Sequence, residues 1–277
     1  MSIEIRRFSS SDTDFEAKIE VLTAPIEDLD QSLVASVRDI ISQIRSGGDA
    51  ALLELTRRFD GFEASSVSEL VYERDDLKAY ESQVDRSALD AVAAAAQRIR
   101  RYHEQQINQD WSIVDDFGNR LGQRSLPMQR AGLYVPGGKA SYPSSVLMNA
   151  IPARVAGVPE IVMVAPAPGG EINPLVLAAA SIVGVDKVIT VGGAQAIAAL
   201  AYGTESVLAV DKVVGPGNRY VAEAKRQVFG KVGIDMIAGP SEIFVIADGS
   251  VDPNWVALDL MSQAEHDEIA QAVCIST

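Results

Sequence analysis

The second half of the chain alternates short apolar runs with helical patterns, and this alternation most constrains the fold. Strands are predicted at 132–135, 160–165, 187–191 and 212–214. Helical patterns separate or follow them, at 144–157, 172–183, 194–202 and 218–229. Strand, helix and strand at this spacing indicate βαβ units and a parallel, Rossmann-like sheet.

The residues on either side of this segment have other patterns. An amphipathic helix is predicted over 32–45, with Gly47 and Gly48 ending it and Asp49 capping the next helix, which runs to residue 59. Further predictions are a short strand at 2–8, an alanine-rich helix at 87–106, a hairpin at 111–128 and a strand at 243–247. Asp252 and Pro253 are typical of a helix start.

The predicted fold class is α/β, with Rossmann-like parallel sheets in two domains and a helical N-terminal region. Composition changes near residue 131, where glycine, alanine and proline become frequent. We therefore expect residues 1–130 to be the N-terminal part of a first domain and 131–236 to be an inserted nucleotide-binding domain. Residues 237–277 would then return to the first domain and leave it incomplete.

Charge and cysteine content limit the partners and the compartment. The net charge of −14 argues against nucleic acid and anionic membranes as partners, because both would repel the chain. The single cysteine, Cys274, excludes an intrachain disulfide and fits a reducing compartment. The longest apolar stretch, 175–185, is too short to span a bilayer. A cytoplasmic location is predicted.

Three glycine turns follow strands of the predicted sheet, at 136–139, 192–195 and 215–218. The ordinary G-x-G-x-x-G fingerprint is absent, but each turn leaves the carboxyl end of a strand and opens a helix. Ligands bind at that edge of open α/β sheets, and glycines there let backbone N–H groups approach a phosphate. One such turn is weak support, since glycine also ends strands for structural reasons. Together, the three turns predict a dinucleotide or phosphate crevice.

The two histidines of the chain differ in setting. His266 lies three residues after Gln263, which places both side chains on one face of a predicted helix. His103 lies among Arg100, Arg101 and Glu104, which is typical of a solvated helix face. A lone helical histidine is more often a surface residue than a ligand. Two ligands are also fewer than a zinc site needs.

Motifs over most of the chain resemble the histidinol dehydrogenase family. They are I-D at 234–235, A-G-P-S-E at 238–242, L-M-S-Q-A-E-H at 260–266, G-L-Y-V-P-G-G at 132–138, and the segments 142–148, 191–200 and 215–218. The resemblance implies NAD-dependent oxidation of L-histidinol through L-histidinal to L-histidine. It implies NAD contacts from Tyr134, Gln195 and Asn218, substrate contacts from Ser241, Gln263 and His266, and zinc ligation by Gln263 and His266.

The resemblance also implies features beyond Thr277, the last residue of the sequence. The family's adjacent Glu-His pair for acid–base chemistry, an aspartate that ligates zinc and a C-terminal histidine ligand have no counterpart before Thr277. We therefore expect no acid–base catalytic residue within the chain, which would be a truncated form without full activity. Family members are intertwined homodimers, so a homodimer is expected for the full-length protein.

Two other hypotheses remain. The chain could be a non-catalytic nucleotide-binding or assembly module of the same family, although such a module would have no reason to keep Gln263 and His266. It could also be an aldehyde dehydrogenase-like enzyme. Cys274 argues against that hypothesis, because it lies in an apolar, strand-like run and not in the electropositive setting of a reactive thiol.

Overall fold

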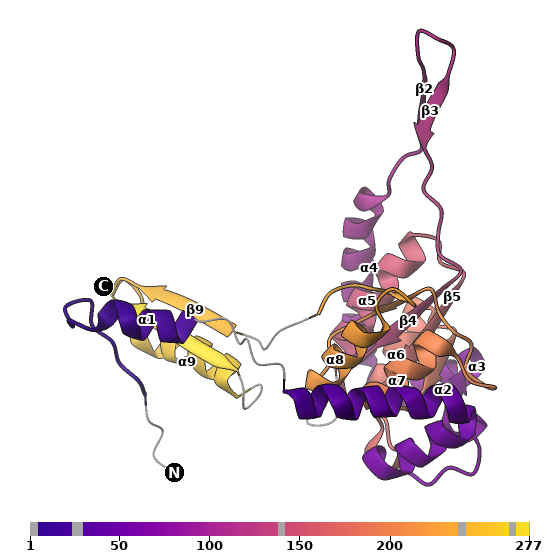
Figure 1. Cartoon of the computed structure of the whole chain (residues 1–277), viewed down its shortest axis with the longest axis horizontal. Coiled ribbons are helices and arrows are strands. Elements are labelled where there is room, and N and C mark those ends of the chain that lie inside the picture. The colour runs from indigo at the N-terminus through magenta and orange to yellow at the C-terminus, as the bar shows by residue number, and fades with distance from the viewer. Residues whose placement is uncertain (1–4, 24–29, 138–141, 238–241, 266–269, 277) are drawn as a thin grey trace.

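The computed structural model describes residues 5–23, 30–137, 142–237, 242–265 and 270–276. Helices and strands alternate through these ranges (Figure 1). The helices are α1 (Phe15–Thr23), α2 (Gln31–Asp60), α3 (Arg74–Tyr80), α4 (Arg86–His103), α5 (Pro143–Val155), α6 (Pro174–Val183), α7 (Gly193–Tyr202), α8 (Arg219–Val228) and α9 (Pro253–Ala264). The strands are β1 (Val71–Glu73), β2 (Trp111–Val114), β3 (Arg120–Gln123), β4 (Arg130–Tyr134), β5 (Glu160–Val164), β6 (Lys187–Ile189), β7 (Lys212–Val214), β8 (Gly233–Ile234), β9 (Glu242–Ala247) and β10 (Gln271–Ser276).

The main sheet has six strands in the order β1-β6-β5-β4-β7-β8. β4 to β8 pair in parallel, and only β1, at one edge, is antiparallel to its neighbour. Numbered along the chain, the parallel strands lie in the order 3-2-1-4-5, which is the arrangement of nucleotide-binding α/β sheets. The predicted α/β class with a parallel, Rossmann-like sheet is confirmed.

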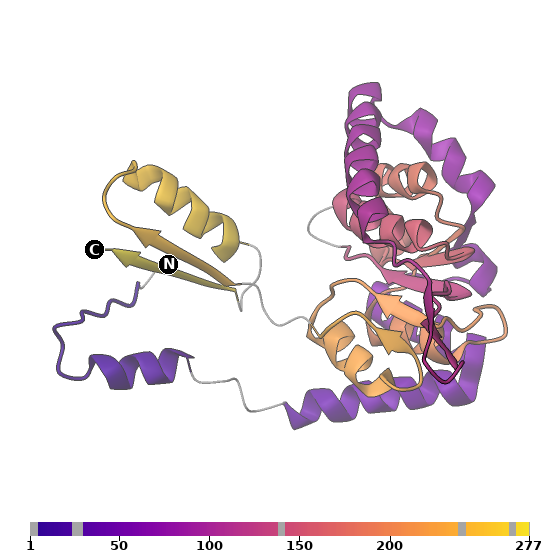
Figure 2. The ribbon, with the colours of Figure 1, turned by 90° about the horizontal axis from the view of Figure 1, so that it is seen from above.

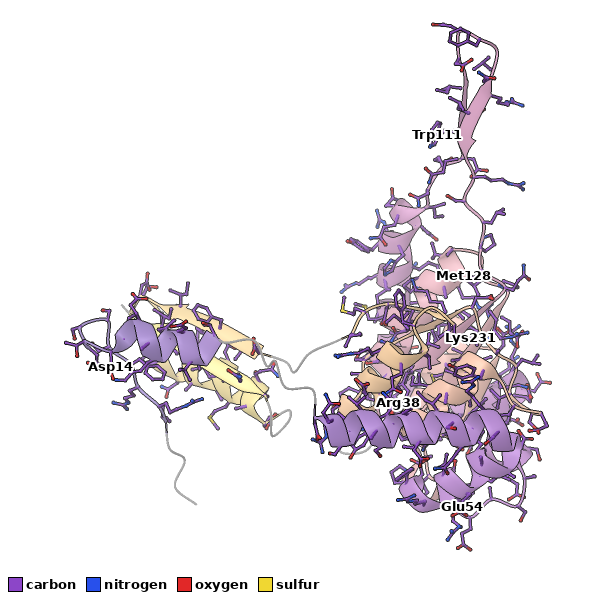
Figure 3. All side chains as sticks on the ribbon, viewed as in Figure 1. Asp14, Arg38, Glu54, Trp111, Met128 and Lys231 are labelled. Carbon is purple, nitrogen blue, oxygen red and sulfur yellow. The ribbon has the colours of Figure 1, made fainter. Side chains whose placement is uncertain are left out.

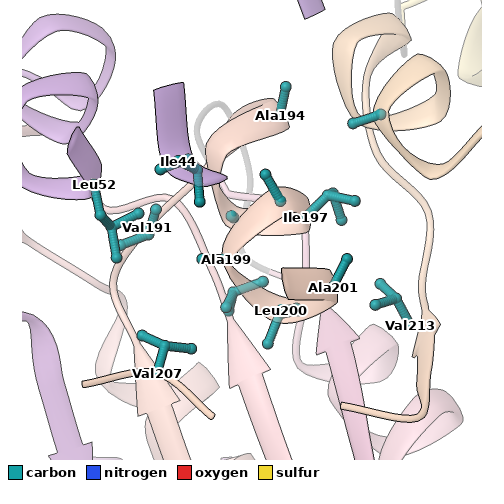
Figure 4. Close-up of a cluster of buried hydrophobic side chains, with 14 of the residues drawn as sticks. Ile44, Leu52, Val191, Ala194, Ile197, Ala199, Leu200, Ala201, Val207 and Val213 are labelled. Atoms are coloured by element: carbon teal, nitrogen blue, oxygen red, sulfur yellow. The ribbon is translucent and has the colours of Figure 1, made fainter. Parts of the chain in front are cut away.

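Helices cover both faces of this sheet, and the two resulting cores explain the near-continuous apolar runs of its strands. In β5, Ile161 and Met163 belong to one core and Val162 and Val164 to the other. One core contains α3, α4, α5 and α6. The other contains α2, α7 and α8 (Figure 4). Figure 2 shows helices on both sides of the strands. Because α7 packs against both α2 and α8 over the sheet, it is apolar on nearly all sides.

The N-terminal helices belong to this packing. β1 is a strand of the main sheet, α2 contacts α7 and α8, and α4 contacts α5 and α6. Residues 31–103 therefore pack with the segment that follows residue 130, whereas the sequence placed them in the domain of residues 237–277. A covering helix has the same amphipathic pattern whichever sheet it covers, so its pattern does not identify its partner. The assignment of residues 237–277 to a first domain stays a prediction.

α2 passes through the expected break as a kink. Gly48 has a non-helical φ of 50° and ψ of −132°, so the range of α2 holds two helical segments that meet at this glycine, the second ending at Asp60. The predicted break and the second helix are therefore confirmed, but the side chain of Asp49 does not cap that helix. Its carboxylate accepts hydrogen bonds from the backbone N and the hydroxyl of Ser206, and its own N–H donates to Glu205 at 2.7 Å. These bonds tie the kink to the loop after α7.

The predicted hairpin is confirmed, with β2 antiparallel to β3 and Gly118 and Asn119 in its turn. All eight strand residues are exposed, including Trp111, which is labelled in Figure 3. The side chain of Asp115 closes the turn by accepting from the N–H groups of Phe117 and Asn119.

The C-terminal unit is one βαβ element, in which β9 and β10 pair in parallel and contact α9. Asp252 accepts a hydrogen bond from the N–H of Asn254, and Pro253 is the first helical residue, as predicted. The strand predicted at 2–8 is not formed at residues 5–8, and residues 2–4 lie outside the described ranges. No helix within the described ranges is long and apolar enough to cross a membrane.

Candidate functional site

The main sheet has a switch point between β4 and β7, which are neighbours although β5 and β6 separate them in sequence. The helix after β4, α5, packs into one core, and the helix after β7, α8, packs into the other. The two connections therefore leave the carboxyl edge of the sheet toward opposite faces. Ligands of open α/β sheets bind at such a point.

The turn after β7 lies directly against the end of β4. Gly215 has a φ of 118°, and a Cβ atom there would lie 2.0 Å from the carbonyl oxygen of Tyr134. A Cβ atom on Gly217 would lie 2.4 Å from Cγ1 of Val221. Only glycine fits at these two positions, which lets the backbone of the turn approach the edge of the sheet closely.

A buried ion pair holds this turn in place. The ammonium group of Lys225, on α8, is paired with the carboxylate of Asp235, just after β8. Lys225 Nζ also donates to the carbonyl oxygen of Gly215 at 3.0 Å, and Asp235 Oδ2 accepts from the N–H of the same glycine at 2.8 Å. Both backbone groups of Gly215 are thus bound by opposite charges.

The pKa of Asp235 reflects this arrangement. Burial acts to raise the pKa, but the Lys225 ammonium and the N–H groups of Gly215 and Met236 hold it below the usual value for an aspartate. The carboxylate of Asp235 is therefore charged at neutral pH.

Tyr134 ends β4 and is almost fully buried. Its hydroxyl oxygen accepts a hydrogen bond from the N–H of Gly193, in the turn after β6, at 3.2 Å. Burial raises the pKa of the Tyr134 hydroxyl to about 12. The group is therefore a neutral phenol that can donate its proton to a further acceptor.

Gln195, in the first turn of α7, is also buried. Its side-chain amide donates to Oδ2 of Asp60 at 3.4 Å, and the N–H of Gly192 donates to the same oxygen at 3.3 Å. Burial raises the pKa of Asp60 against the effect of these two donors. Tyr134, Gln195 and Asp60 thus meet around one glycine turn.

Asn218 follows the adjacent strand β7 and caps α8. Its side-chain oxygen accepts from the N–H groups of Tyr220 and Val221 at 3.0 and 3.2 Å. The cap directs the N-terminal end of α8 toward the switch point. The structure therefore places Tyr134, Gln195 and Asn218 at the carboxyl edge of one sheet, and their contact with NAD stays a prediction.

The other predicted site residues are only partly within the described ranges. Gln263 is half-buried on α9, on the same helical stripe as the half-buried Val256 and Leu260. Ser241 and His266 lie outside the described ranges. In the part of the chain that the structure describes, no cluster of three or more His, Cys, Asp or Glu residues could hold a metal ion. The predicted zinc site is therefore not tested.

The acid–base groups and the remaining zinc ligands expected from the resemblance are also not tested. Thr277 lies outside the described ranges, which end with β10 at Ser276. The structure therefore does not test the expectation that the Glu-His pair and the remaining zinc ligands of the family lie beyond Thr277. That expectation stays a prediction, and no acid–base catalytic residue is assigned within the chain.

The remaining histidine and the cysteine are not part of the carboxyl edge. His103 ends α4, is half-buried, and its Nδ1 shares a hydrogen bond with Gln106 at 2.6 Å. Cys274 is a free, exposed thiol on β10.

Sequence reasoning missed Asp60, Lys225 and Asp235. Asp60 carries the only local signal, because an acidic residue directly before a helix-ending glycine lies at the negative end of the helix dipole. Asp235 belongs to the I-D motif at 234–235 but was given no role, and Lys225 carries no signal, since a lysine on a helix is commonly a surface residue.

Comparison with known proteins gives a consistent result. A sequence profile described as histidinol dehydrogenase matches residues 25–277. The chain is 59% identical over 272 residues to histidinol dehydrogenase of Pseudomonas syringae pv. tomato, covering 98% of this chain and 61% of that protein. It is 58% identical to the Pseudomonas aeruginosa protein of the same name, covering 98% of this chain and 62% of that one.

A solved structure extends the similarity to the fold. Histidinol dehydrogenase from Elizabethkingia anophelis superposes with a TM-score of 0.84 at 34% identity, over 95% of this chain and 60% of that chain. The chain spans about three fifths of the length of the relatives it matches.

Proposed function

Because this chain belongs to the histidinol dehydrogenase family, we propose that it carries the NAD-binding part of an oxidoreductase. The reaction is the oxidation of L-histidinol through L-histidinal to L-histidine, the last steps of histidine biosynthesis. The observation that supports NAD binding best is the switch point of the main sheet, where the turn after β7 lies against the end of β4. When bound, NAD would accept the hydride from the reacting carbon of the substrate.

The residues at this edge have separate tasks in the proposal. Tyr134 and Gln195 hold the turn after β6 and offer polar groups to the dinucleotide. Asn218 fixes the first turn of α8, and the positive end of that helix dipole favours a phosphate. The Lys225–Asp235 pair fixes both backbone groups of Gly215, so the crevice keeps its shape before the cofactor arrives.

Zinc remains part of the proposal through Gln263 and His266, whose spacing on the predicted helix supports a shared ligand face. Ser241, Gln263 and His266 would also contact L-histidinol. A zinc ion bound there would orient and polarise the substrate as a Lewis acid. The amide oxygen of Gln263 is a neutral ligand, which suits a metal that positions substrate.

The proposal also includes a homodimer and a cytoplasmic location. The resemblance supports the dimer, and the low cysteine content supports a reducing compartment. Sedimentation equilibrium of the protein that carries this chain is expected to give twice the monomer mass.

Binding of NAD is tested by calorimetric titration of the 277-residue chain. We expect saturable binding to the wild type and weaker binding to Tyr134→Phe, which loses the acceptor for the Gly193 N–H. Tyr102→Phe, at an exposed tyrosine on α4, is the matched control and should bind as the wild type does. Absence of NAD binding by the wild type would contradict the proposal.

Catalysis is tested in the protein that carries this chain. Conversion of an alcohol to an acid removes two hydrides, so each L-histidinol oxidised should yield two NADH. Gln263→Ala should reduce this turnover while NAD binding is retained. If NAD binds but L-histidinol causes no NADH formation, the chain is instead the non-catalytic nucleotide-binding or assembly module.

A further inference from the structure

Asp60 places a carboxylate where a negative charge does not stabilise the fold. It is the last residue of α2, where the helix dipole is negative, and Gly61 follows in the left-handed conformation. Burial raises the pKa of its carboxyl group. None of the ion pairs among the described residues includes Asp60. An acidic group held against both burial and the helix dipole indicates a function other than stability.

The position of Asp60 in the fold indicates which function. In dinucleotide-binding sheets, an acidic residue after the second strand binds the hydroxyl groups of the adenosine ribose. The second strand here is β5, and the residues after it, A-P-A-P at 165–168, contain no carboxylate. A Cβ atom on Gly192 would lie 2.6 Å from Cβ of Pro166 and 3.0 Å from Oδ1 of Asp60. The carboxylate of α2 thus reaches the end of β5.

One oxygen of this carboxylate is available for a ligand. Oδ2 accepts from the N–H of Gly192 and the amide of Gln195. Oδ1 accepts none of the hydrogen bonds found among the described residues. The two donors fix the carboxylate plane, so the direction in which Oδ1 accepts is fixed as well.

We propose that Asp60 binds the adenosine ribose of the dinucleotide and selects NAD over NADP. This inference rests on the proposed NAD-binding function. Oδ1 accepts hydrogen bonds from the ribose 2′- and 3′-hydroxyls. A 2′-phosphate in place of the 2′-hydroxyl brings a second negative group against the carboxylate and removes the donor, so NADP is rejected.

The test is calorimetric titration of the wild type and Asp60→Asn with NAD and with NADP. Asparagine keeps an acceptor for the Gly192 N–H but removes the charge. The Kd for NAD should rise about tenfold, the worth of a hydrogen bond to a charged group, while NADP binding is unchanged or tighter. Asp39→Asn, an exposed aspartate on the same helix, is the control and should leave both Kd values unchanged.

A second measurement needs no variant. The wild type should bind 5′-AMP about tenfold more tightly than 2′-deoxy-AMP, because only AMP donates from the 2′-position. Asp60→Asn should lose this preference. The Asp60→Asn variant should unfold at a higher temperature than the wild type, because it removes the charge from the negative end of the α2 dipole. A cooperative unfolding transition also verifies that the variant folds.

The outcomes separate the two proposals. If the wild type binds neither dinucleotide, the proposed function fails and this inference fails with it. If the wild type binds NAD but Asp60→Asn weakens NAD and NADP equally, Asp60 only positions the turn and the inference alone is overturned. Equal affinity of the wild type for AMP and 2′-deoxy-AMP would overturn it in the same way.

Discussion

At the scale of single residues, the Lys225–Asp235 pair is the most sensitive point at the carboxyl edge of the main sheet. Lys225 is almost fully buried and Asp235 about two thirds buried. Lys225→Met should lower the free energy of unfolding by about 3 kcal/mol, because it leaves the carboxylate without its partner in a poorly solvated place. Urea denaturation measures the loss. The double variant Lys225→Met with Asp235→Asn should recover part of it, and a double variant as unstable as the single one would contradict this account.

The same pair makes a defined contribution to acid stability. Because the folded pKa of Asp235 is lowered, its stabilising effect is complete above the pKa of an unfolded aspartate, about 3.9, and is lost as the pH falls through the lower folded pKa. Asp235→Asn has no such titration. Its urea midpoint should therefore fall less steeply than that of the wild type below about pH 4. Parallel pH profiles would show that the carboxylate is not held by charge.

Single residues were predicted unevenly from sequence. Resemblance named Tyr134, Gln195 and Asn218, and the structure places all three at the carboxyl edge of the main sheet. Asp60 was missed because its partner Gly192 is 132 residues further along the chain. Local pattern carries no information about a contact at that distance. Lys225 was missed for a different reason, since helices that carry lysine usually expose it.

At the scale of elements, the turn after β7 depends on glycine for two reasons that can be separated. Gly215→Ala would introduce a Cβ atom 2.0 Å from the Tyr134 carbonyl oxygen as well as a side chain at positive φ. Gly118→Ala, in the hairpin turn, has a φ of 81° and no atom within 4 Å of the new Cβ. The control should cost about 1 kcal/mol, the ordinary penalty of a left-handed alanine.

The Gly215→Ala variant should lose several times more stability than the control and should also lose NAD binding, because the backbone of the turn has to move away from β4. Thermal unfolding and NAD titration of the two variants make the comparison. Equal losses of stability would mean that the turn moves easily and that close approach is not required.

Element prediction succeeded where periodicity is local. The four strand and four helix patterns from residue 132 to 229 match β4 to β7 and α5 to α8 within two residues at every boundary. β1 and β8 were not predicted, since three and two residues are too few for a pattern. The glycine pair at 47–48 correctly predicted the break within α2, whereas the bonds from Glu205 and Ser206 that hold it come from another part of the chain and were not predicted.

At the scale of the molecule, the strands of the main sheet and their parallel order were predicted better than the helices that pack on its faces. Parallel order follows from the βαβ pattern, so the carboxyl edge could be placed in advance. The packing of α2 and α4 on that sheet could not, because their apolar stripes fit any complementary surface. Fold class could therefore be predicted from periodicity, while the packing partners of each helix depend on contacts between distant parts of the chain.

This division of the molecule leads to a prediction about where NAD acts. All residues assigned to the NAD crevice lie between Asp60 and Asp235, on the main sheet and its helices, and none lies in the β9-α9-β10 unit. A ligand that binds only the folded form stabilises the unit it contacts by RT ln(1 + [L]/Kd), about 2.7 kcal/mol at one hundred times Kd. At that NAD concentration, amide hydrogen exchange should slow in β4, β7 and the first turn of α8.

Exchange in β9, α9 and β10 should be unchanged. Zinc and L-histidinol, added next, should slow exchange around Gln263. If NAD alone protects β9 and β10 as much as β4, the cofactor contacts both units and the crevice at the switch point is only part of its site.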